Sequence, residues 1–242
     1  MNLDFGPVCA AHRPRANAAS CGGARGRNLS RGLLYAAALT LVGTFFAPLW
    51  HYNFTVPLYP EYPQGLPMTI YINHLEGRID LINELNHYIG MRKIQDSDFV
   101  ALRVMPWLVA LLVAGALATA TWGRDRLWPL ATWLGVFAVS GLVLLGDFYW
   151  WLYTYSHDLN PHAAIRMPPF TPQLFGSYTI LNTFHVMTWP GLGGIAMAAS
   201  FALGFAAFAA QWLGRRAVAR GGREHARVLA HGPAKPALLS WR

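Results

Sequence analysis

The stretch VMPWLVALLVAGALATATW, residues 104–122, decides the class of protein to which the chain belongs. It holds no charged side chain and is long enough for a helix that crosses bilayer hydrocarbon, which takes about 20 residues. Backbone groups in hydrocarbon have no water to bond with, so a helix, whose hydrogen bonds are internal, is the expected structure. The sequence therefore predicts a transmembrane helix here.

Three more long apolar stretches occur, at residues 32–50, 128–149 and 190–213, and the second of these contains one charged residue, Asp147. The whole chain has 54% hydrophobic and 12% charged residues, whereas about 25% of the residues in a soluble domain are charged. Burial of these helices in a soluble bundle is the alternative, and the scarcity of charge within the stretches disfavours it. We predict an all-α membrane domain over residues 32–213, with four transmembrane helices.

The positive charges of the chain predict its orientation. Most of the 19 Lys and Arg residues lie in the segments 1–31, 123–127 and 214–242. The positive-inside rule then places both termini in the cytoplasm, and segments 51–103 and 150–189 outside. Because orientation in a bilayer explains the basic charge, we expect lipid and no nucleic acid as a partner.

The basic tails, residues 1–31 and the part after Arg216, lack apolar periodicity and are expected to be disordered. The first span is open to a second interpretation, as a cleaved signal peptide. Its polar lead is long and it ends in FFAPLW rather than in small residues, so an uncleaved anchor is favoured.

The first outside segment contains HLEGRIDLINELNHYIGMRKI, residues 74–94. Its apolar residues recur at steps of three and four, which predicts an amphipathic helix lying on the membrane surface or on the second span. Gly90 is a stop signal for this helix. Residues 68–72, MTIYI, could form a short strand.

Histidine and methionine side chains collect in the outside segments. Imidazole and thioether groups together suit copper. The candidate ligands are His87, His157, His162, Met167 and His185. The alternative is that these histidines are hydrogen-bonding residues at the membrane interface. Neither cysteine belongs to a CxxCH motif, which excludes c-type haem, and no candidate histidine lies within a span, which disfavours b-type haem.

Asp147 is a carboxylate near the outer end of the third span, where burial in lipid is costly. Arg103 stands at the outer start of the second span, at a similar depth, so we expect a structural Asp147–Arg103 ion pair. The alternative is that Asp147 supports a histidine ligand or a proton step. If the helix continues past the interface, Asp147, Trp151, Thr154 and Asp158 share one face.

Small residues follow one another at four-residue spacing in the last span, at Ala196, Ser200 and Gly204. Such a ridge lets another helix approach closely. The partner helix could belong to this chain or to another subunit.

Two motifs, NELNHYIGMRKI (83–94) and DFYWWLYTYSHDLNPHAAIRMPPFTPQLFG (147–176), resemble a family of small bacterial membrane proteins encoded beside nitrous-oxide reductase and its copper-maturation factors. The resemblance covers about residues 45–195 and departs from the family pattern at Arg166, where lysine is expected. It implies importance for Asn86, His87, Gly90, Met91, Asp147, His157, Pro161 and His162.

The resemblance implies a non-enzymatic accessory protein of the bacterial cytoplasmic membrane. Such a protein would support copper handling or the assembly of a periplasmic cuproenzyme such as nitrous-oxide reductase, in denitrification, with a membrane or periplasmic protein as partner. The alternative is a structural or anchoring subunit of a membrane redox complex, with no metal of its own. The sequence contains no nucleophile–base pair and no phosphate-binding loop, so we do not expect an enzyme. A permease is disfavoured because no span is broken or polar at mid-depth.

Overall fold

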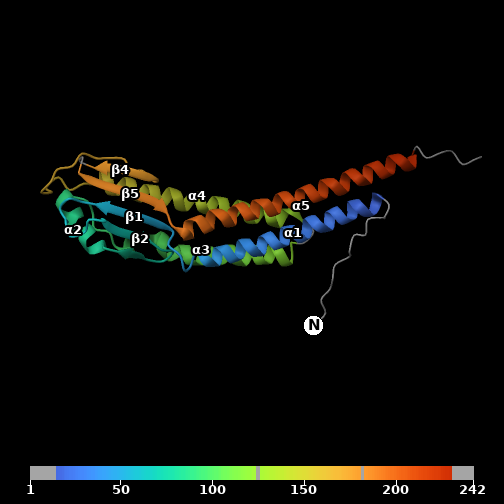
Figure 1. Cartoon of the computed structure of the whole chain (residues 1–242), viewed down its shortest axis with the longest axis horizontal. Helices are drawn as coiled ribbons and strands as arrows, with labels where there is room; N and C mark the ends of the chain where they lie inside the picture. The colour runs from blue at the N-terminus through green and yellow to red at the C-terminus, as the bar shows by residue number, and fades with distance from the viewer. Residues whose placement is uncertain (1–14, 124–125, 181–182, 231–242) are drawn as a thin grey trace, which may run out of the picture.

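The computed structural model describes residues 15–123, 126–180 and 183–230. The molecule is elongated, with long helices along its axis and a β-sheet at one end (Figure 1). The start of α1 and the end of α5 both lie toward the opposite end. The elements are α1 (Arg15–Gly43), β1 (Trp50–Thr55), β2 (Leu66–Ile70), β3 (Leu75–Gly77), α2 (Ile79–Ile89), η1 (Asp96–Asp98), α3 (Val100–Thr121), α4 (Leu127–His157), β4 (Gly176–Ile180), β5 (Phe184–Pro190) and α5 (Leu192–Ala230).

Three helices are long and apolar enough to cross a membrane: α3, α4 and the part Leu192–Arg223 of α5, with mean hydropathies of 2.1, 1.8 and 1.8. They coincide with the second, third and fourth predicted spans, so these membrane-length helices are confirmed. Helix α4 continues to His157, beyond the predicted end of its span.

The prediction of an all-α fold is wrong, because the chain also forms a five-stranded antiparallel sheet in the order β3-β2-β1-β5-β4. The central pair, β1 and β5, aligns Trp50 with Pro190 and Thr55 with His185. These strands come from distant parts of the sequence, but β1 follows α1 and β5 leads into α5. Since α1 and α5 pack together, their continuations meet and pair. The expected strand at 68–72 overlaps β2.

The first span is also corrected, because α1 ends at Gly43 and Trp50 begins a strand. Upstream, the helix begins at Arg15, so the part of the N-terminal tail from Arg15 onward is helical rather than disordered. The C-terminal tail is likewise helical as far as Ala230. The two long helices support each other: a Cβ on Gly26 of α1 would lie 3.0 Å from the carbonyl oxygen of Ala210. Residues 1–14 and 231–242 fall outside the described residues.

The small-residue ridge of α5 packs within the chain's own bundle. The Ser200 hydroxyl is fully buried and donates to the carbonyl oxygen of Ala37 in α1, at 2.9 Å. A Cβ on Gly204 would collide with the Trp133 ring of α4. The ridge therefore serves contacts to both α1 and α4.

Helix α2 is amphipathic as predicted, but it covers the sheet rather than the membrane surface or the second span. Ile82 of α2 is buried in one cluster with Leu66 and Met68 of β2 and Val186 of β5. The cluster also receives Phe148 from α4. The extended end of α4 and the whole of α2 thus form a single unit with the sheet.

Candidate functional site

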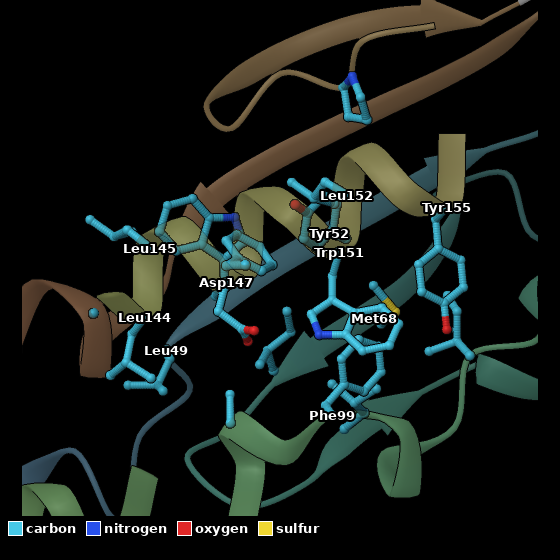
Figure 2. Close-up of a pocket in the computed structure, with 18 of the residues that line it drawn as sticks. Leu49, Tyr52, Met68, Phe99, Leu144, Leu145, Asp147, Trp151, Leu152 and Tyr155 are labelled. Carbon is cyan, nitrogen blue, oxygen red and sulfur yellow. The ribbon is translucent and has the colours of Figure 1, made fainter. Parts of the chain in front are cut away.

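An apolar cavity of about 670 Å³ lies where the sheet, α2, α3, α4 and α5 meet. This volume falls within the range of about 300–1,000 Å³ that is typical of small-molecule sites. Figure 2 shows part of its wall, to which Tyr52, Met68, Phe99, Trp151 and Tyr155 contribute. The cavity is the strongest candidate for a binding site in the described part of the chain.

Asp147 provides the one carboxylate among the residues that line the cavity, and no Lys, Arg or His joins it. Its carboxylate points into the cavity (Figure 2) and forms no hydrogen bond or ion pair with any residue that the structure describes. The residue lies about 30 Å along α4 from Leu127, at a rise of about 1.5 Å per residue. This distance matches the thickness of bilayer hydrocarbon, about 30 Å.

The expected Asp147–Arg103 ion pair is absent from the described residues. Arg103 instead donates from Nη2 to the carbonyl oxygen of Ser97, at 3.1 Å. Ser97 belongs to the 3₁₀ turn η1, which immediately precedes α3. The arginine is therefore used to close this turn, and Asp147 is left facing the cavity.

The aromatic walls of the cavity are neutral. Burial raises the pKa of the Tyr178 hydroxyl to about 12 and also raises the pKa of Tyr52, so both remain protonated at neutral pH. Phe99 packs edge-on against Trp151, with ring centroids 5.1 Å apart. Asp147 thus sits in a neutral, aromatic surrounding.

The candidate copper ligand His157 and the predicted structural residue Asp158 lie at the end of α4. The ring of His157 stacks on Tyr153, and its Nδ1 lies 3.0 Å from the Tyr153 carbonyl oxygen. Asp158 forms an exposed ion pair with Arg92, at 3.8 Å. The pair joins the end of α4 to the segment that follows α2.

The other candidate copper ligands are spread over the sheet end of the molecule. His87 lies exposed on α2, and His162 lies exposed in the segment after α4. His185, on β5, is bonded through Nδ1 to the Thr179 hydroxyl at 3.0 Å, whereas Met167 is buried. Within the described residues, no three His, Cys, Asp or Glu side chains are grouped so that they could share a metal ion. The copper site stays a prediction.

The two motifs that carry the family resemblance pack against each other. The backbone N–H of Asn160 donates to the carbonyl oxygen of Gly90 at 2.8 Å, and that of Ile165 donates to the carbonyl oxygen of Tyr88 at 3.0 Å. These bonds fix the segment after α4 to the end of α2. The motifs therefore describe one structural unit rather than two separate loops.

Two asparagines hold the turn after α2. The side chain of Asn83 accepts from the N–H of Ile94 at 2.7 Å and donates to the Ile94 carbonyl oxygen at 2.9 Å. The side-chain amide of buried Asn86 donates to the carbonyl oxygen of Arg92 at 3.3 Å. The backbone carbonyl of Asn86 accepts from the backbone N–H of Met91 at 2.8 Å. Asn86 and Met91 thus have structural roles.

Sequence reasoning did not assign the roles of Asn83 and Tyr155. The Tyr155 hydroxyl donates to the carbonyl oxygen of Lys93 at 3.0 Å, which ties α4 to the same turn. The sequence offered one indication of the role of Asn83: an amide side chain can bond to a backbone N–H and to a backbone C=O at the same time. The partner of that side chain becomes identifiable only in the folded chain.

Gly90 lies at a close contact between the two motifs, where a side chain would have no room. Its φ is +78°, and a Cβ would lie 2.8 Å from the Ala163 Cβ and 2.9 Å from the Asn160 carbonyl oxygen. We expect Gly90→Ala to lower the free energy of unfolding by about 2–3 kcal/mol, measured by denaturant titration in detergent. Gly176→Ala is the matched control, because its φ is +97° but nothing lies within 4 Å of the new Cβ. An equal loss in both variants would refute the steric argument.

A comparison of the chain with protein-family models, and another with curated proteins, found no match.

Proposed function

We propose that the chain is an integral protein of the bacterial cytoplasmic membrane, with α1, α3, α4 and α5 as its spans and both termini inside. The end of α3 and the start of α4 lie away from the sheet, as do the described chain ends (Figure 1). This arrangement supports an orientation in which the arginine-rich segments share the cytoplasmic side.

Exposed tryptophans support the depth of insertion. Trp128 and Trp150 are 79% and 66% exposed and lie about 33 Å apart along α4. Tryptophan is enriched at both interfaces of a bilayer, so this spacing fits a membrane span.

Arg31 of α1 donates to the Ala120 carbonyl oxygen at 3.1 Å, near the end of α3, where a cation is favoured by the helix dipole.

The proposed function is that of a non-enzymatic accessory protein that supports copper handling, or the assembly of a periplasmic cuproenzyme such as nitrous-oxide reductase. The observation that carries this proposal is that the two motifs with the family resemblance, residues 83–94 and 147–176, are hydrogen-bonded to each other at the sheet end of the molecule. The backbone bonds of Tyr88 and Gly90 to the segment after α4 bring the neighbourhoods of His87 and His162 together. Exposed imidazoles on one outside surface are suited to receiving or passing on a copper ion.

The proposal predicts stoichiometric Cu(I) in the detergent-purified protein after loading, and its loss in the double variant His157→Ala, His162→Ala. Metal analysis with a chromogenic Cu(I) competitor provides the measurement. The double variant His51→Ala, His74→Ala is the control, since it removes two histidines from the sheet region. Absence of copper from the parent protein would refute copper binding and favour the alternative, an anchoring subunit without a metal.

A further inference from the structure

The cavity around Asp147 lacks a counter-charge for its carboxylate. The residues that line it include no Lys, Arg or His, and Asp147 has no bonding partner in the described part of the chain. Asp147 is half-buried, and a carboxylate that faces an apolar lining is stabilised by a cation or a hydrogen-bond donor that approaches it. A ligand that enters the cavity with a positive charge would supply this compensation.

The walls of the cavity favour an organic cation over a metal ion. Trp151 lies one helical turn after Asp147 on α4 and packs against Phe99, and aromatic faces attract ammonium groups (Figure 2). Besides the Asp147 carboxylate, the polar groups of the lining are the Asn86 amide, tyrosine hydroxyls and tryptophan indoles. The remaining side chains are apolar. Hard metal ions require several oxygen ligands, which this lining does not offer.

The helix side of the cavity has room for an apolar tail. Phe137, Gly141 and Leu144 of α4 line this part together with Phe201 of α5. A Cβ on Gly141 would meet nothing within 4 Å, so the glycine leaves open space in this part of the cavity, about two helical turns before Asp147. A phospholipid headgroup fits poorly, because its phosphate would find no cation among the lining residues.

We propose that this cavity binds an amphiphile with an ammonium head and a single apolar chain. The ammonium donates to the Asp147 carboxylate beside Trp151, and the chain lies between α4 and α5 along Gly141. This site is independent of the histidines proposed for copper, so either proposal can fail without the other.

The test uses the full chain in a nonionic detergent and counts bound molecules by native mass spectrometry. Dodecylamine is the probe, and dodecanol and phosphatidylethanolamine are the comparison ligands. We expect a one-to-one dodecylamine adduct whose affinity falls about tenfold or more in Asp147→Asn, the size of a charge-assisted hydrogen bond. Asp158→Asn, which removes an exposed carboxylate from the end of the same helix, should bind like the parent.

A second pair of variants tests the position of the tail while Asp147 is retained. Gly141→Leu should fill the cavity and weaken dodecylamine binding by a similar factor. Gly135→Leu should not, because Gly135 lies on α4 outside the cavity and its Cβ also meets nothing within 4 Å. Equal binding by Asp147→Asn and the parent would overturn the proposal, as would equal affinity for dodecanol or phosphatidylethanolamine, or unchanged binding in Gly141→Leu.

Discussion

Replacing Trp133 with alanine is expected to lower the free energy of unfolding by about 3–5 kcal/mol, the largest loss from any single side chain in the bundle. The Trp133 side chain is 5% exposed and lies between α3 and α5. A Cβ on Gly115 of α3 would lie 2.8 Å from its ring, and a Cβ on Gly204 of α5 would collide with it. Gly115 and Gly204 therefore leave the space between α3 and α5 that the Trp133 ring fills.

The Trp133 ring is also held in place by polar and aromatic contacts. Its indole N–H donates to the Leu112 carbonyl oxygen at 2.9 Å, and Phe137 packs edge-on at 5.5 Å. Truncation would leave a void and one fewer interhelical hydrogen bond. Within lipid such a void is costly, since helix association there depends on close packing.

The measurement for this prediction is unfolding of the purified protein in mixed micelles with increasing denaturing detergent. Trp128→Ala is the matched control, because Trp128 lies on the same helix but is 79% exposed. We expect the control to unfold at the same detergent fraction as the parent. A comparable loss in both variants would show that general tryptophan anchoring, and not interhelical packing, sets the stability.

Sequence analysis predicted α3, α4 and α5 because each satisfies its own backbone and carries an uninterrupted apolar stretch. No role was predicted for Trp133, since nothing in its local sequence reveals that Gly115 and Gly204 face it. Helix packing of this kind depends on the spatial arrangement of three segments. It is therefore visible only in the structure.

The sheet could not be predicted for a related reason. Strands β1 and β5 lie at opposite ends of the outside segments, and their pairing follows from the packing of α1 against α5. Trp50 and Pro190 were assigned to the ends of spans because the apolar stretches run through them. Strand pairing between distant segments leaves no local periodicity that could correct such an assignment.

The candidate site was predicted in part. Asp147 was recognised from its chemistry, as a carboxylate at the edge of an apolar span. Its partner was predicted wrongly, because Arg103 turns back to Ser97. The cavity lies where the helices meet the sheet, and the sheet as a whole was not predicted from the sequence.

The second large effect is expected at the start of α5, where Gly194→Val should lower the free energy of unfolding by about 3 kcal/mol or more. A Cβ on Gly194 would lie 2.5 Å from the Leu49 carbonyl oxygen, and one on Gly193 would lie 2.5 Å from that of Ala47. These are backbone atoms, which have no rotamer by which to move aside. The N–H of Gly193 also donates to the Pro48 carbonyl oxygen, at 2.8 Å.

The same measurement applies to Gly194→Val, with Gly146→Val on α4 as its control, since a Cβ there would meet nothing within 4 Å. Hydrogen exchange should quicken along β1 and β5 in the first variant and stay slow in the second. The expectation follows from the position of the glycine, where α5 joins β5 and the Leu49 carbonyl precedes β1. Because this junction aligns the sheet on the helices, its disruption should also open the cavity around Asp147. Unchanged exchange in Gly194→Val would refute the role of this close backbone approach.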